Sequence, residues 1–153
     1  MVLTSRLTHG GRRLPPDWAE LSAAGHVAPR SAPDWSQPVP QYGLDAQRTV
    51  AWFAASCDPR ANALAARWWR VLDHPARYQA LALRLDGAVL NPTRAVLPFV
   101  AAAAAASADD AEVDSLRLLR LAEIQQHRSP GYYGGAWSAF GPALLNSRAL
   151  SGC

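Results

Sequence analysis

The stretch Tyr42-Gly43-Leu44-Asp45-Ala46-Gln47-Arg48, continuing through Thr49 to Trp52, decides how this chain is organised, because a coil gives way there to an apolar helix. If Asp45 opens that helix, Arg48 lies one turn further along the same face, close enough to pair with it. The helix dipole and the arginine both favour the ionised carboxylate. Two roles fit such an anion beside the ring of Tyr42: a general base, or an N-cap salt bridge that only fastens the chain.

Helical spacing of small and apolar residues continues after this stretch. Asp58-Pro59 and His74-Pro75 separate successive segments, and Asp86-Gly87 forms a turn. The segment from Thr93 to about Ser107 is apolar on nearly every face, which predicts an inner, fully buried helix. The predicted helical segments are 45–56, 59–72, a short piece that ends at the turn 86–87, 93–107, 109–126 and 132–145, with 88–91 as a connection.

The first 40 residues are rich in proline, which predicts coil there with at most one short helical turn near Asp17. No convincing run of alternating β-branched residues is present, so no strand is predicted. We therefore expect a single all-α domain over 1–153: coil over 1–40 and helical hairpins over 41–153. Five to six helices in concentric layers predict part of an (α/α)6 toroid.

Composition excludes several classes of protein. The fifteen basic residues are all arginines, scattered along the chain, and no basic run is interleaved with aromatics as in nucleic-acid binders. The longest apolar run, Ala95 to Ala106, is too short to span a bilayer. We therefore expect neither nucleic acid nor a membrane as a partner. The polar start of the chain lacks the apolar core of a secretion signal.

The histidines and cysteines of the chain decide whether a metal site or a disulfide is expected. The four histidines show no ligand spacing, and two cysteines cannot form a structural zinc site alone, so no metal and no cofactor are expected. Cys57 and Cys153 could form one bridge or remain two thiols; the sequence leaves both alternatives open.

Three stretches together resemble a known family. Leu14-Pro15-Pro16-Asp17-Trp18, then the stretch from Tyr42 to Arg48, then Ser129-Pro130-Gly131-Tyr132-Tyr133 before a helix rich in glycine and alanine, resemble glycoside hydrolase family 8. That family comprises inverting enzymes that act on β-1,4-glucans, chitosan and related polysaccharides. The resemblance covers the whole chain and matches the C-terminal half of the family's barrel.

The resemblance implies roles for five residues. Asp45 would be the catalytic base that activates water, Arg48 would hold its carboxylate, and Tyr42 would lie near the cleaved sugar. Tyr132 and Tyr133 would line the cleft and bind substrate. Leu44 departs from the pattern, because an aromatic residue is common at that position.

The family's catalytic acid is a glutamate in the N-terminal half of the barrel, and no glutamate here matches its motif. We therefore expect a fragment that lacks the acid half, inactive alone, which self-associates or pairs with a missing N-terminal half. Secretion is what the family suggests, although this chain shows no signal peptide. Two alternatives stay open: a non-catalytic module that binds β-linked polysaccharide or oligosaccharide, and a helical interaction module.

Overall fold

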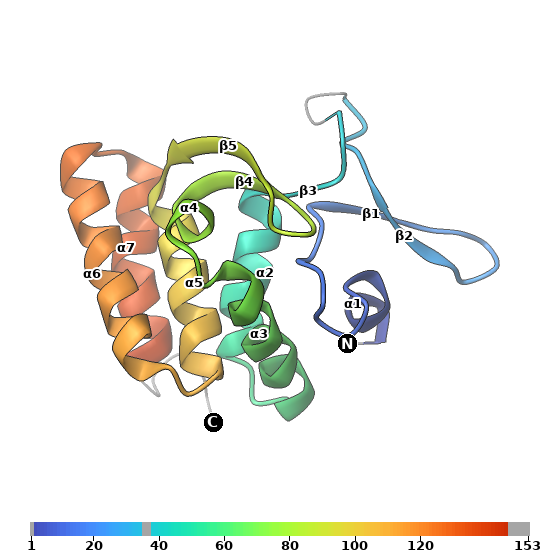
Figure 1. Cartoon of the computed structure of the whole chain (residues 1–153), viewed down its shortest axis with the longest axis horizontal. Helices are drawn as coiled ribbons and strands as arrows, with labels where there is room; N and C mark the ends of the chain where they lie inside the picture. Colours follow the sequence, from blue (N-terminus) through green and yellow to red (C-terminus); the bar gives the residue numbers. More distant parts are fainter. Residues whose placement is uncertain (1, 35–37, 147–153) are drawn as a thin grey trace.

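The computed structural model describes residues 2–34 and 38–146, and it contains sheets as well as helices (Figure 1). Within these residues, seven helices account for 56% and five strands in two small antiparallel sheets for 15%. The all-α prediction, and with it the partial toroid, is therefore wrong: the fold is mixed α/β. The helices are α1 (Val2–Leu7), α2 (Leu44–Ala54), α3 (Pro59–Leu72), α4 (Pro75–Tyr78), α5 (Val96–Ala108), α6 (Glu112–Arg128) and α7 (Tyr132–Asn146); the strands are β1 (Trp18–Leu21), β2 (Val27–Arg30), β3 (Gln41–Tyr42), β4 (Ala80–Arg84) and β5 (Val89–Arg94).

The first correction concerns the N-terminal region, which was predicted to be coil. Strands β1 and β2 pair there as an antiparallel hairpin, with Trp18 opposite Arg30 and Leu21 opposite Val27. Gly25 allows the turn because its φ is +77°. All four residues of β1 are exposed. Because neither face of the strand is buried, its sequence does not show the alternation of apolar and polar residues that indicates a strand. Figure 1 shows this hairpin beside α1, on the opposite side of the molecule from α6 and α7.

The second correction concerns the segment around Asp86-Gly87, where a helical piece and a connection were predicted. Strands β4 and β5 form a hairpin there, and Gly87 at the turn has a φ of +91°. Alanine and leucine fill β4, and both residues favour helices, so local propensity indicated the wrong structure. The hairpin turn signal Asp-Gly between apolar residues was the better guide.

The three-stranded sheet fixes where α2 begins. Its order is β3–β4–β5, with Gln41 opposite Arg84 and Tyr42 opposite Leu83. Because one residue separates β3 from α2 and one residue separates β5 from α5, both helices begin beside this sheet. In Figure 1, β4 and β5 arch over this end of the helices, where the connection from α6 to α7 also lies.

Helix α5 is the centre of the core, as its apolar sequence predicted. Eleven consecutive residues, Val96 to Ala106, are buried. The helix packs against α2, α3, α6 and α7, and the small alanine side chains permit close approach on several sides. The five long helices lie within a few residues of their predicted bounds.

Candidate functional site

A pocket of about 190 Å³ lies at the end of the molecule where α2, α5 and α7 begin. It is bounded by the start of all three helices, by β4 and β5, and by the end of α6. Three helix N-termini and Arg94 bring positive charge to the pocket, and the C-terminus of α6 brings partial negative charge. Such a mixed polar lining suits a ligand that carries hydroxyl groups. Its lining residues are Leu44, Leu81, Arg94, Ala95, Val96, Leu97, Gln125, Ser129, Gly131, Tyr133 and Gly134.

The first turn of α2 is capped by a residue from far away in the sequence. Gly43 occupies the N-cap position and has no side chain to offer. Instead, Asp17 Oδ1 accepts hydrogen bonds from the backbone N–H groups of Gly43 (3.0 Å) and Ala46 (2.9 Å). A side chain at Gly43 would collide with Asp17, since a Cβ built there lies 2.3 Å from Asp17 Oδ2. The start of α2 is thus capped by Asp17 and not by Asp45.

Asp45 lies in the first turn of α2 and forms an ion pair with Arg48, three residues further on. The two side chains are 47% and 43% exposed, respectively, so the pair is open to solvent. This arrangement matches the local geometry predicted from the sequence. Because an exposed ion pair contributes little to folding stability, fastening the chain is a weak reason for it.

Tyr42 takes a different position from the one that the resemblance implied. Its side chain is 2% exposed within the core, and its hydroxyl has no hydrogen-bond partner among the described residues. Burial, followed by the nearby charge of Asp17, raises the pKa of this phenol well above its ordinary range. The structure does not bring Tyr42 to the pocket.

The two late tyrosines separate as well. Tyr133 lines the pocket together with Ser129 and Gly131, and it is 42% exposed. Tyr132 is 95% exposed and is not among the residues that line the pocket. Of the five predicted site residues, Tyr133 alone lines the pocket. Leu44, the first residue of α2, also lines it, and Asp45 and Arg48 follow Leu44 in the first two turns of that helix.

A row of aromatic rings that begins at the pocket residue Tyr133 was not predicted from the sequence. It runs from Tyr133 to Trp137 (6.5 Å between ring centroids), to Phe140 (6.0 Å) and across to Trp52 on α2 (5.9 Å). Trp52 and Phe140 are 48% and 40% exposed. Tyr133, Trp137 and Phe140 recur every three to four residues, which indicates one face of a helix. Nothing in the sequence indicated that α7 packs against α2.

No glutamate lies at the pocket. Glu20 on β1 pairs with Arg30, and Glu123 on α6 pairs with Arg120. Glu112 begins α6, whereas the pocket adjoins the other end of that helix, about 25 Å away at 1.5 Å per residue. The exposed carboxylate of Asp45 follows the pocket residue Leu44 in the sequence, and neither Asp45 nor a glutamate is among the residues that line the pocket.

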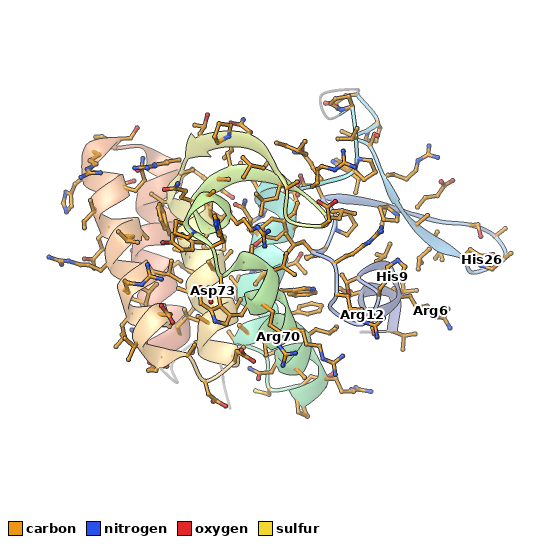
Figure 2. All side chains as sticks on the ribbon, viewed as in Figure 1. Arg6, His9, Arg12, His26, Arg70 and Asp73 are labelled. Atoms are coloured by element: carbon orange, nitrogen blue, oxygen red, sulfur yellow. The ribbon has the colours of Figure 1, made fainter. Side chains whose placement is uncertain are left out.

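Within residues 2–34 and 38–146, no group of three or more His, Cys, Asp or Glu side chains is placed to hold a metal ion. Nor does this part contain a helix long and apolar enough to cross a membrane. Cys57 is disulfide-bonded, and Cys153, the other cysteine of the pair considered above, lies outside the described residues. In Figure 2 the labelled side chains of Arg6, His9 and Arg12 lie around α1, on the opposite side of the molecule from α6 and α7.

Comparisons of the chain with protein-family models, with curated proteins and with solved structures find no match. The resemblance to glycoside hydrolase family 8 therefore rests on the quoted stretches alone. Residues of two of those stretches, Leu44 and Tyr133, line one pocket although 88 residues separate them in the sequence.

Proposed function

We propose that this chain binds a β-1,4-linked glycan at the pocket and carries the base half of an inverting glycoside hydrolase site, with Asp45 as the base. One observation carries the proposal: Leu44, next to Asp45, and Tyr133 line the same pocket. The fold thus brings two of the stretches that carry the resemblance together at one pocket.

The residues supply the parts that binding a sugar requires. The ring of Tyr133 offers a flat apolar face for the C–H groups of a sugar ring, and Arg94, Gln125 and Ser129 offer hydrogen-bonding groups for hydroxyls. Asp45 is open to solvent and lies at the positive end of the α2 dipole, which favours its charged form.

In the proposed reaction, Asp45 takes a proton from a water molecule, the oxygen of that water bonds to the anomeric carbon, and the glycosidic bond breaks on the opposite face. The leaving oxygen must receive a proton from an acid roughly 6.5–9.5 Å from the base. No glutamate among the described residues lies at the pocket. We therefore expect this chain alone to bind glycan without turning it over.

The proposal can be tested by NMR titration or calorimetry with cellohexaose and chitosan hexamer, using the α-linked maltohexaose as the ligand control. We expect binding of a β-linked ligand and no release of reducing ends. Tyr133→Ala should weaken binding roughly three- to tenfold, the loss expected for one aromatic contact. Asp45→Asn should leave both the fold and the affinity nearly unchanged, because the base acts on water.

Tyr132→Ala is the matched control, since Tyr132 is a neighbouring tyrosine that does not line the pocket. Its affinity should equal that of the unsubstituted chain. Equal losses in the two tyrosine variants, or no binding of either β-linked ligand, would rule the proposal out. Release of reducing ends that survives Asp45→Asn would rule out the role of Asp45.

A further inference from the structure

The exposed side of α2 and α7 forms an apolar face. We define the α2–α7 face by Trp52, Tyr133, Ala136 and Phe140, all of which are exposed. The last three follow one another at intervals of three and four residues, so they form one stripe along α7. Trp52 and Phe140 join the two helices in an edge-to-face contact, with ring planes at 72°.

Helix α7 has the apolar composition of a buried helix, but most of its residues are not buried. None of its fifteen residues is charged, and only Trp137, Gly141 and Leu144 are buried. A helix with one side in water ordinarily carries charged or polar residues on that side. The α2–α7 face therefore has the character of a contact surface.

The size of this face suits the centre of a protein interface. An aromatic side chain presents roughly 150–250 Å², so the three rings, each 40–48% exposed, leave on the order of 300 Å² open. A standard interface buries about 800 Å² per partner, and its energy comes mainly from a few central aromatic residues. The smaller and polar residues around these rings would form the rest.

Charge favours a second copy of this chain over a strongly charged partner. The described residues of α7 carry no charge, and Asp45 and Arg48 at the edge of the face compensate each other. Among the described residues, arginines such as Arg6, Arg12 and Arg70 lie on the side of α1 and α3, away from this face (Figure 2). A strongly acidic or basic partner would find no complementary charge here, whereas two identical neutral faces meet without repulsion.

We infer that the α2–α7 face pairs two copies of this chain in a symmetric dimer, with each Phe140 and Trp52 packed against the same face of the partner copy. A two-fold axis makes such a self-complementary contact closed, so association stops at two. The inference does not rest on the proposed glycan site. Tyr133 belongs both to this face and to the pocket, so dimerisation is tested without ligand, where glycan binding cannot affect the result.

The first test is sedimentation velocity and light scattering of the full chain from low to high micromolar concentration. We expect a dimer that dissociates on dilution. Phe140→Glu should shift the full chain to monomer over the whole range, because two new carboxylates would face each other in an apolar contact. Leu116→Glu is the control, since Leu116 is a 52% exposed leucine on α6, outside the face, and this variant should remain dimeric.

A second measurement does not depend on how well a charged variant folds. A photoreactive benzoylphenylalanine at position 140 keeps an aromatic ring there. On irradiation it should give a covalent dimer whose crosslink maps to α2 or α7 of the other copy, while the same group at position 116 should give none. A chain that stays monomeric, a dimer unaffected by Phe140→Glu, or crosslinks that reach only other proteins in a mixture would each overturn the inference.

Discussion

Helices α5 and α7 are the two long helices of the described structure without a charged residue, yet their surroundings differ. Helix α5 is buried over eleven consecutive residues, whereas α7 buries only three. The same composition therefore has two explanations. For α5, neighbouring helices of the same chain remove its apolar surface from water. For α7, the residues that the structure describes leave one side exposed.

The contact between these helices shows how α7 is held. Its glycines and Pro142 give it a low helix propensity, so packing must stabilise it. At Gly141 a Cβ atom would lie 2.9 Å from Val100 Cγ1 on α5 and 3.3 Å from Leu119 Cδ2 on α6. Glycine at this position lets α7 approach α5 closely, while the opposite side of α7 stays open.

The sharpest way to break the comparison is to place the same charge on each helix. Ala103 on α5 is 0% exposed, and Ala103→Glu buries a carboxylate with no partner. We expect the loss of most or all of a folding free energy that is roughly 5–15 kcal/mol for a domain of this kind. Circular dichroism and urea denaturation would show a chain that is unfolded or nearly so.

Ala136→Glu is the matched change on α7, where the alanine is exposed. At concentrations where the chain is monomeric, its free energy of unfolding should stay within about 0.5 kcal/mol of the original. Similar losses in the two variants would show that α7 is as enclosed as α5 and would remove the basis of the comparison.

Two glycine-to-alanine substitutions in α7 should change the free energy of unfolding by smaller amounts and in opposite directions. Gly141→Ala forces a methyl group against Val100, and overpacking of this kind costs about 1–3 kcal/mol, partly offset by the better helix propensity of alanine. At Gly135 the nearest atom to an added Cβ is the end of the flexible Gln126 side chain, 3.2 Å away. Gly135→Ala should therefore stabilise the fold by up to about 1 kcal/mol. Urea denaturation of both variants measures these two changes in the free energy of unfolding. A Gly141→Ala variant that is more stable than the original would contradict the close contact with Val100.

The smallest effect concerns α3, which supports α5 from another side. Asp58 caps α3 by accepting from Arg60 N (2.9 Å), and its side-chain hydrogen bonds with the Arg60 guanidinium lower the pKa of the carboxyl group. Because the folded pKa lies below the unfolded one, the charged cap stabilises the fold above the unfolded pKa, about 4, and this contribution is lost as pH falls through the folded value.

Asp58→Asn isolates that charge, since asparagine also caps helices. The variant should be slightly less stable than the original at pH 7, and the difference should vanish in acid, as measured by thermal unfolding at several pH values. A difference that is constant with pH would mean that the charge of Asp58 contributes nothing to the fold.

Prediction from the sequence succeeded where a pattern was long and failed where it was short. The long helices and the burial of α5 followed from periodicity and from an unbroken apolar run. Strands β4 and β5 were missed because their alanines and leucines favour helices, and the exposed β1–β2 hairpin offered no hydrophobic alternation. Within the candidate site, the pairing of Asp45 with Arg48 is local and could be predicted. The cap from Asp17 and the contact of Trp52 with Phe140 join distant segments, and no spacing rule indicates them.

The sequence by itself determined which segments become long helices, which of them is wholly apolar, and that an acid and an arginine share the first turns of α2. Tertiary structure alone decided that Tyr42 is buried, that Asp17 caps α2, that Leu44 and Tyr133 meet at one pocket, and that one side of α7 faces solvent. The physical reason is the range of the interactions: helix periodicity and i,i+3 pairing act within a few residues, whereas burial and capping depend on which distant segments the sheet and the core bring together.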